Sequence, residues 1–269
     1  MASSLKDKVA IVTGSSSGIG EAIALAFATR GANVTLCGRD PERLKSVLDT
    51  VVEVSGGHTD RFLTMKGDLT DSGVRKDIIE KTIEKFGRVD TLVANAGQAG
   101  MQGSIHNATE ESYDAVMNTN VKSVFFLIQQ AIPHLEKSKG NIVVISSNVT
   151  SMMMPFGAVY SISKAALDHL TRCLAVDLGQ KGIRVNGVNP GYIPTRLSRA
   201  LGENKAIIDK IGELDASKTP LKGRSLTVED IAKAVVFLSS DDAGFITGEN
   251  IKVDGGRTFS GAVDNLPNH

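Results

Sequence analysis

Three side chains in one stretch of this chain could together move a proton. Tyr160 and Lys164 are four residues apart, and on a helix that spacing places both on one face, one turn apart. An ammonium beside a phenol favours the phenolate, so we expect Lys164 to lower the pKa of Tyr160 from about 10 towards neutrality. Ser147 follows the apolar run 142–145 and could donate to the oxygen that Tyr160 protonates. The stretch is a candidate for general acid–base chemistry.

The spacing of Tyr160 and Lys164 alone would also suit a surface tyrosine beside a solvated lysine, so the elements that place them decide between the two interpretations. Short apolar runs of the buried-strand type alternate with helix-like segments. Repeated strand–helix units predict an α/β fold of the Rossmann type, a doubly wound parallel sheet with helices on both faces. We predict seven strands, at about 8–13, 32–37, 61–66, 89–94, 141–146, 183–188 and 250–253.

Helices are predicted between these strands from apolar periodicity and from their terminal residues. Asp71 and Thr227 are predicted N-caps, and Pro41 starts another helix. The predicted helices span about residues 20–31, 41–54, 71–87, 110–135, 160–179, 195–215 and 227–238, of which 195–215 is the least regular.

A glycine-rich loop follows the first predicted strand, with Gly14, Gly18 and Gly20 before a helix. A strand, a glycine loop and a helix in this order are the context of a dinucleotide-binding fingerprint, in which the helix N-terminus faces the phosphates. The spacing G-x-x-x-G-x-G differs from the G-x-G-x-x-G pattern, and the loop by itself suits a plain turn equally well.

Polar residues or glycines follow each of six predicted strands, and in doubly wound sheets ligands bind outside the carboxyl ends of the strands. Six such positions at the same edge indicate a cofactor site. They are Gly14, Arg39, Asp68, Asn95, Ser147 and Pro190.

The composition indicates one domain over residues 1–269, with a core at about 5–256 and a tail at 257–269. The chain is 41% hydrophobic and its net charge is zero, so we expect no nucleic-acid partner. No apolar run reaches 18 residues and no apolar leader is present, so we expect no membrane span and a soluble, cytoplasmic protein. The five histidines lack metal spacing, so we expect no metal. Cys37 and Cys173 are expected to be buried free thiols.

Taken in order, the motifs resemble those of the short-chain dehydrogenase/reductase family over about residues 5–256. Ala94 is a small departure, because many members have a second asparagine there. The motifs are Thr13-Gly-Ser-Ser-Ser-Gly-Ile-Gly20, Asn95-Ala-Gly97, Asn120, Ser147, Tyr160-x-x-x-Lys164, Pro190-Gly191-x-x-x-Thr195 and Val253-Asp-Gly-Gly256.

The resemblance implies a single Rossmann domain, a nicotinamide cofactor and a catalytic tetrad. Tyr160 would be the general acid in reduction and the base in oxidation, Lys164 would hold the nicotinamide ribose, and Ser147 would orient the substrate oxygen. Asn120 would hold a water in the proton relay, although a helix-interior asparagine that bonds the backbone is the alternative. The implied cofactor contacts are Gly14, Ser16, Ser17, Gly18, Ile19, Gly20, Arg39, Asp68, Leu69, Asn95, Ala96, Gly97, Tyr160, Lys164, Pro190, Gly191, Ile193 and Thr195.

We expect NADP(H) rather than NAD(H). An NAD-selective site needs a carboxylate at the end of the second strand, and Gly38 stands there with Arg39 next. Glycine leaves room for a phosphate, and arginine gives it a charge-assisted donor. Ser17 and Asp40 weaken this expectation, because many NADP-using relatives carry a second basic residue at the first position and the second could oppose the phosphate.

Three functions are compatible with these features. The favoured one is a reductase or dehydrogenase that interconverts a small-molecule carbonyl and an alcohol. A sugar-nucleotide epimerase or dehydratase shares Tyr-x-x-x-Lys, but its larger relatives carry a longer C-terminal substrate region. A non-catalytic dinucleotide-binding protein would have no reason to keep the tetrad. The segment 195–215 is expected to cover the substrate, and Met152, Met153 and Met154 either line an apolar pocket or simply pack.

We also expect a homo-oligomer, and the resemblance to the family implies a tetramer. Five consecutive apolar residues, 124–128, go fully round a helix and cannot all face the sheet. The predicted helix 160–179 is apolar on more than one stripe as well. A helix that is apolar all round needs cover on both sides, and a symmetry mate is one such cover. The alternative cover is internal, from 195–215 or the tail.

Overall fold

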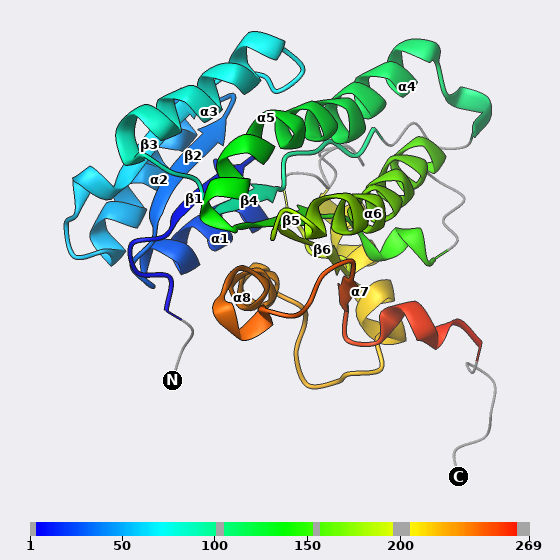
Figure 1. Cartoon of the computed structure of the whole chain (residues 1–269). Helices are drawn as coiled ribbons and strands as arrows, with labels where there is room; N and C mark the ends of the chain where they lie inside the picture. Colours follow the sequence, from blue (N-terminus) through cyan, green and yellow to red (C-terminus); the bar gives the residue numbers. More distant parts are fainter. Residues whose placement is uncertain (1–3, 101–104, 153–156, 196–204, 263–269) are drawn as a thin grey trace.

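The protein is seen in a computed structural model that describes residues 4–100, 105–152, 157–195 and 205–262 (Figure 1). Seven parallel strands form one sheet in the order β3-β2-β1-β4-β5-β6-β7. The predicted doubly wound α/β fold is therefore confirmed. The strands are β1 Val9–Thr13, β2 Asn33–Gly38, β3 Phe62–Lys66, β4 Thr91–Ala94, β5 Asn141–Ile145, β6 Arg184–Pro190 and β7 Asn250–Val253.

The chain fills one half of the sheet outward from β1, and then returns to place β4 on the other side of β1. This reversal makes the gap between the β1 and β4 loops a topological switch point, where ligands of such folds bind. The loops after β1 and β4 are therefore the expected place for a ligand.

Helices cover both faces of the sheet, as Figure 1 shows. Asp71 accepts from the Gly73 N–H, and Asp230 accepts from the Thr227 N–H, so the two predicted N-terminal boundaries are correct. The helices are α1 Gly18–Ala28, α2 Pro41–Val54, α3 Ser72–Phe86, α4 Glu110–Met117, α5 Ser123–Ser138, α6 Ala158–Gly179, α7 Lys205–Lys218 and α8 Val228–Ser239.

The long helix predicted at 110–135 is not uniform. A π-helical turn, Asn118–Lys122, separates α4 from α5. Apolar periodicity does not report such a turn, because the chain stays helical through it. Turns of this kind often mark functional positions, and this one carries Asn120.

Alternate residues of the strands enter two separate cores, one on each face of the sheet. Ala10 and Val12 of β1 belong to the core shared with α1, α2 and α8. Ile11, between them, belongs to the core shared with α3, α5 and α6. The sheet is thus anchored from both sides, and the loops at its carboxyl edge start from fixed points.

Two predictions about single segments need correction or cannot be assessed. Cys173 is free but exposed, whereas Cys37 is buried as expected, and burial raises the pKa of its thiol. The helix stripe that carries Cys173 faces away from the sheet, so an apolar composition did not ensure burial. Met153, Met154, the segment 196–204 and the tail segment 263–269 lie outside the described residues. No helix in the described ranges is long and apolar enough to cross a membrane.

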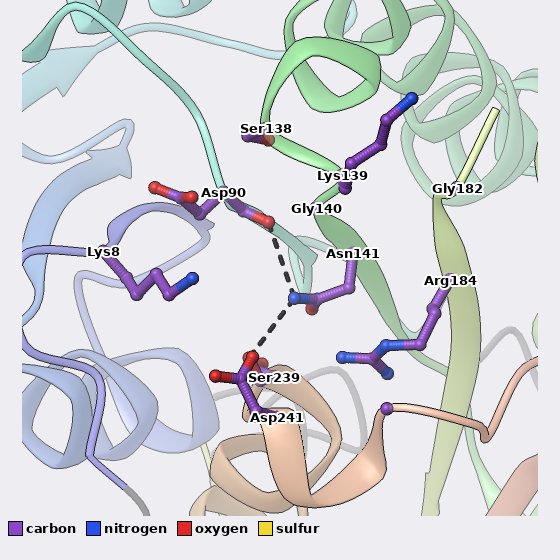
Figure 2. Close-up of a pocket in the computed structure, with 11 residues that line it drawn as sticks. Lys8, Asp90, Ser138, Lys139, Gly140, Asn141, Gly182, Arg184, Ser239 and Asp241 are labelled. Atoms are coloured by element: carbon purple, nitrogen blue, oxygen red, sulfur yellow. Dashed lines mark hydrogen bonds between the residues drawn. The ribbon is translucent and has the colours of Figure 1, made fainter.

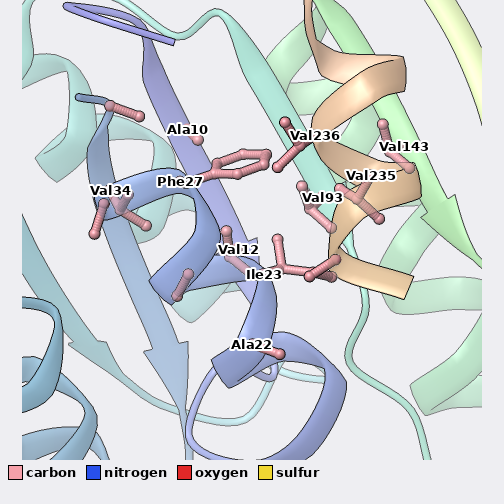
Figure 3. Close-up of a cluster of buried hydrophobic side chains, with 14 of the residues drawn as sticks. Ala10, Val12, Ala22, Ile23, Phe27, Val34, Val93, Val143, Val235 and Val236 are labelled. Carbon is pink, nitrogen blue, oxygen red and sulfur yellow. The ribbon is translucent and has the colours of Figure 1, made fainter. Parts of the chain in front are cut away.

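Phe27 is a large, fully buried side chain of the α1–α8 core. Figure 3 shows Ile23 and Phe27 of α1 meeting Val235 and Val236 of α8 above the sheet, and Phe27 is 1% exposed. Phe27→Ala should lower the free energy of unfolding by about 3–5 kcal/mol, because it removes a buried ring and leaves a cavity. Chemical denaturation measures this change. Phe259→Ala, at a site that is 75% exposed, is the matched control, and a loss as large as that of Phe27→Ala would contradict the assigned core.

Candidate active site

The glycine loop after β1 packs directly against the loop after β4. Gly14 has a φ of +65°, and a Cβ there would lie 2.9 Å from the Cα of Ala96. A Cβ at Gly20 would lie 2.4 Å from the carbonyl oxygen of Gly14. Both contacts are too short for any side chain, so the sequence needs glycine at these two positions.

The loop after β6 reaches the same place. A Cβ at Gly18 would lie 3.4 Å from the side chain of Thr195, and a Cβ at Gly191 would lie 3.0 Å from the Cβ of Asp254. Pro190, predicted to follow the strand, is its last residue and pairs with Val253. The predicted cofactor contacts from three separate loops therefore converge on the N-terminus of α1.

The start of α1 is suited to an anion. Ser17 occupies the N-cap position with an extended backbone, and its side chain makes no capping hydrogen bond. Main-chain N–H groups at a helix N-terminus bind phosphate well when side chains do not cap them. The glycine cradle and this helix end fit the pyrophosphate of a dinucleotide. Ile19 packs against the α1–α8 core and fixes the direction of the helix.

Asn95 supports the cradle by bonding its main chain. Its side-chain amide donates to the Thr13 carbonyl at 2.8 Å, and the Thr13 hydroxyl accepts from the N–H groups of Asn95 and Ala96 at 2.9 and 3.1 Å. The structure thus gives Asn95 a role in shaping the loops, through bonds within the protein.

The end of β2 carries the residues expected to choose the cofactor. A Cβ at Gly38 would lie 2.9 Å from the hydroxyl oxygen of Ser16, so a carboxylate residue at position 38 would displace that serine. Asp40 caps α2 and forms an ion pair with Arg43. Hydrogen bonds from Arg43 hold the pKa of Asp40 below its usual value. The negative charge of Asp40 is therefore already balanced by the positive charge of Arg43.

Arg39 lies beside Asp68, with 3.5 Å between the guanidinium and the carboxylate. Burial opposes ionisation of Asp68, but hydrogen bonds from Thr70 and the charge of Arg39 outweigh it and lower its pKa. Leu69 is buried, and its carbonyl accepts from Arg75 at 2.5 Å. The loop after β3 is thus held by its own bonds next to Arg39.

Ser147, Tyr160 and Lys164 come together at the end of β5. The Ser147 side chain is close enough to the Tyr160 phenol to lower its pKa. The Lys164 ammonium lies 5.6 Å from the centre of the Tyr160 ring and donates to the Ile145 carbonyl at 2.9 Å. A Cβ at Gly97 would lie 3.6 Å from the Lys164 nitrogen. The three side chains therefore lie beside the loop after β4.

The pKa shifts correct one expectation. Tyr160 is half-buried as a residue, but its phenol is enclosed by protein, and burial raises its pKa to about 12 against the opposing hydrogen bond from Ser147. Burial also lowers the pKa of Lys164 to about 8, against the charge of Asp168. The expected lowering of the Tyr160 pKa by Lys164 is therefore wrong for this structure. The ammonium is directed at the Ile145 carbonyl, and desolvation of the phenol dominates.

Asn120 lies on the π-helical turn and is fully buried. Its side-chain oxygen accepts from the Gln98 N–H at 2.8 Å, and its amide donates to the Gln98 carbonyl at 2.9 Å and to the Ser163 hydroxyl at 3.0 Å. The side chain thus bonds the backbone, which was the alternative to a water-holding role. It ties the loop after β4 to α6.

The segment expected to cover the substrate is described in part. Tyr192 donates its hydroxyl proton to the Ile208 carbonyl of α7 at 3.2 Å. Ile193 packs against the α1–α8 core next to it. One side of α7 is therefore fastened to the loop that also carries Thr195.

Sequence reasoning missed Asn189 and Asp168, both buried beside the site. Asn189 donates to the Ser147 carbonyl and to the Asp168 carboxylate. Two signals could have found them: Asn189 directly precedes the Pro190-Gly191 motif, and Asp168 follows Lys164 by one helical turn.

A hollow of about 230 Å³ lies at the opposite edge of the sheet (Figure 2). Two of its charged groups have partners within the protein: Asp90 pairs with Arg88, and Arg184 donates to carbonyls at the end of α8 at 2.9 and 3.2 Å. Within the described residues no group of His, Cys, Asp or Glu could hold a metal. The hollow is no candidate for the chemistry. It is lined by polar and charged residues such as Lys8, Asp90, Asn141, Arg184 and Asp241.

Comparisons with known proteins agree with the class that the fold and site define, a dinucleotide-binding oxidoreductase. A family model described as enoyl-(acyl carrier protein) reductase matches residues 14–258. A 3-oxoacyl-(acyl-carrier-protein) reductase of Thermotoga maritima is 37% identical over 94% of this chain and 98% of its own length. The chain belongs to the short-chain dehydrogenase/reductase family.

Two solved structures extend the comparison. A short-chain dehydrogenase/reductase of unknown function from Caenorhabditis elegans, crystallised with cofactor, has a TM-score of 0.87 and 34% identity over 94% of this chain and 96% of that one. A 7α-hydroxysteroid dehydrogenase in complex with NADH and 7-oxo glycochenodeoxycholic acid has a TM-score of 0.85 and 33% identity, over 94% and 95% of the two chains. The family therefore supports a nicotinamide cofactor for this protein.

Burial of Lys164 has a consequence for stability that depends on pH. Its pKa falls from 10.5 to about 8 on folding, so below pH 8 both states hold the proton and the folded state bears the full cost of the buried charge. Between pH 8 and 10.5 the unfolded state binds more protons, so stability rises with pH. From pH 7 to 10 the wild-type protein should gain about 2–3 kcal/mol relative to Lys164→Met.

Urea denaturation of both proteins across this pH range measures the difference. Titration of Tyr160, which has a raised pKa and acts mainly above pH 10, is common to both proteins and largely cancels in the comparison. A difference in stability that stays constant with pH would contradict the assigned environment of Lys164.

Proposed function

We propose that this protein is an NADP(H)-dependent oxidoreductase that interconverts a carbonyl and an alcohol, with Tyr160 as general acid and base. The observation that supports it most is the buried group of Ser147, Tyr160 and Lys164 beside the glycine cradle. A nicotinamide cofactor in that cradle would supply the hydride to the carbonyl carbon, or accept it from the alcohol. The acyl-carrier-protein reductase and hydroxysteroid dehydrogenase relatives act on carbonyl or alcohol substrates by their names.

The proposed roles of the side chains follow from their chemistry. In reduction the Tyr160 hydroxyl gives its proton to the substrate oxygen, and in oxidation the phenolate takes that proton. The Ser147 hydroxyl donates to the same oxygen and stabilises the charge that develops on it. The Lys164 ammonium would hold the nicotinamide ribose, which would draw it away from the Ile145 carbonyl. Because the Asn120 side chain is bonded to Gln98 and Ser163, any proton-relay water would be held by the main chain of Asn120 on the π-helical turn.

Further residues are proposed to bind the cofactor or to shape the loops that hold it. The set comprises Gly14, Ser16, Ser17, Gly18, Ile19, Gly20, Arg39, Asp68, Leu69, Asn95, Ala96, Gly97, Pro190, Gly191, Ile193 and Thr195, with residues 1–269 forming one domain in a cytoplasmic protein.

Removal of the Tyr160 hydroxyl tests the acid. Tyr160→Phe deletes only the ionisable oxygen, so turnover should fall by roughly two or more orders of magnitude while cofactor affinity is kept. Steady-state turnover with a panel of ketones and a fluorescence titration of the cofactor measure the two quantities. Tyr113→Phe, at an exposed position on α4, is the control. Near-normal turnover of Tyr160→Phe would show that another group is the acid.

The same panel separates the proposal from the two other functions. Net oxidation of reduced cofactor by a ketone requires an oxidoreductase. A sugar-nucleotide epimerase or dehydratase returns its hydride and shows no net oxidation, and a binding protein shows no turnover.

Arg39 is proposed to choose NADP(H) over NAD(H). No carboxylate can stand at position 38 without displacing Ser16, and Asp40 is already paired with Arg43. The carboxylate that does lie beside Arg39 is that of Asp68, in an exposed pair at 3.5 Å. A charge-assisted bond to the 2′-phosphate is worth about 1.5–3 kcal/mol, so Arg39→Ala should reduce the preference for NADPH over NADH roughly ten- to a hundredfold. Titration of both reduced cofactors measures the ratio, with Lys45→Ala on α2 as control. Tighter binding of NADH by the wild-type protein would refute the preference.

A tetramer is proposed from two separate sets of exposed apolar side chains. Phe125 of α5 and Ile162 of α6 are exposed, and we assign them to one surface; Phe237 of α8 and Phe245 beyond its end are also exposed, and we assign them to the other. Two distinct self-complementary surfaces build a tetramer with dihedral symmetry. The chain mass is 28.4 kDa. Light scattering should give four times this chain mass for the wild-type protein and two times this chain mass for Ile162→Glu, which would be a dimer. A monomeric wild-type protein would instead point to an internal cover.

A further inference from the structure

Asn189 connects three parts of the candidate site with a single amide. It is 1% exposed, and its side-chain nitrogen lies 3.1 Å from the Ser147 carbonyl oxygen, 3.0 Å from the Thr150 hydroxyl and 2.9 Å from the Asp168 carboxylate, so its two protons are shared among three acceptors. The amide thus spans β6, the turn after β5 and the helix α6. The Ser147 main chain and the face of α6 that carries Lys164 are held to one point.

Asp168 is an unusual residue for its position. It is 9% exposed, and its second carboxylate oxygen has no hydrogen-bond partner within the described chain. No ion pair of the described residues includes it. A buried carboxylate with so few donors costs stability, and packing alone does not explain why a carboxylate stands there.

The charge that Asp168 opposes is one helical turn away. Lys164 and Asp168 are four residues apart on α6, both buried, and the carboxylate favours the ammonium form of Lys164. The Lys164 ammonium itself is bonded to the neutral Ile145 carbonyl. The carboxylate therefore supplies the negative charge that the immediate surroundings of Lys164 lack.

We propose that Asp168 and Asn189 form a positioning pair for this active site. Asp168 keeps Lys164 charged at working pH, and Asn189 fixes Ser147 relative to α6. Neither residue touches the reacting atoms. The inference deepens the proposed function and rests on the roles given there to Tyr160 and Lys164.

Among the groups that surround Lys164, Asp168 is the main source of negative charge. Along α6 the titratable side chains within one turn of Lys164 or Asp168 are Tyr160, His169 and Arg172, of which the last two are exposed.

From β7 comes Lys252, which pairs in register with Asn189 and whose ammonium lies 5.7 Å from the centre of the Phe259 ring. The other groups beside the pair are neutral. The next carboxylate, Asp254 after β7, makes no direct bond to the pair within the described residues. It accepts a hydrogen bond from the Asn148 amide at 3.4 Å. The neutral groups are Asn120, Ser147, Ser163, Asn189 and Asn250.

Asp168→Asn tests the pair, because it removes the charge and keeps the shape. In the reduction direction activity needs the Lys164 ammonium, so it declines as pH rises. Without the carboxylate the ammonium is less favoured, and the alkaline limb of the pH profile of kcat should move to lower pH by about one unit. A merely structural role would lower kcat at every pH and leave the limb in place.

Two further variants complete the design. Asp168→Glu keeps the charge and should keep the limb within a few tenths of a unit of the wild-type position, whereas Asp177→Asn removes an exposed charge from the same helix and should change nothing. Asn189→Ala should lower kcat about tenfold without moving the limb, since it loosens Ser147 and leaves the Asp168 charge. An unmoved limb in Asp168→Asn overturns the proposal.

Folding is checked by circular dichroism for each variant, and Asp168→Ser is the second neutral variant. If neither neutral variant folds, Asp168 serves folding and the proposal is overturned. Tyr160→Phe, run beside them, distinguishes the two levels. If Tyr160→Phe is active, the proposed function is wrong. If Tyr160→Phe is inactive and the alkaline limb of Asp168→Asn has not moved, only the positioning pair is wrong.

Discussion

The burial of one lysine ammonium is the constraint on which the rest of the site depends. Lys164 is 4% exposed, and its nearest partner is the neutral carbonyl of Ile145. A charge in such a place is costly unless hydrogen bonds and an opposite charge offset the loss of water. The same burial enlarges every electrostatic effect that the ammonium exerts. The buried Lys164 ammonium therefore lowers the stability of the fold, but it places a positive charge close to the Tyr160 phenol.

Such a charge is useful only if its surroundings cannot relax, and the fold provides this. The two cores hold β5 from both faces of the sheet, and one of them packs α6 against the sheet. The Ile145 carbonyl then stands at the end of a buried strand, and Lys164 on a helix packed beside it. Rigid elements keep the donor and acceptor in place without water, which is what electrostatic preorganisation requires. The glycine cradle is equally rigid, because Gly14 and Gly20 allow backbone contacts that no side chain would permit.

The sheet and the clustering of the candidate site residues at its carboxyl edge could be predicted from the sequence, because both follow from local patterns. Apolar runs give the strands, and the glycine and Tyr-x-x-x-Lys spacings give the loops. What failed depends on contacts across the fold. The π-helical turn at 118–122 leaves the apolar period almost unchanged, the exposure of Cys173 depends on which helix face meets the sheet, and the direction of the Tyr160 pKa depends on how fully the phenol is desolvated. None of these can be deduced from neighbours in sequence.

Side-chain amides replace main-chain partners where the strands of the sheet diverge. Asn95 and Asn120 bond peptide groups of the loops after β1 and β4, and Asn189 bonds the main chain after β5. An amide carries a donor and an acceptor like a peptide, so it satisfies buried loop backbone without adding a charge. The edge of the sheet is thus polar and rigid but nearly free of net charge. In such surroundings the field at the phenol is governed by few ionised groups, which is why one buried carboxylate beside Lys164 can matter.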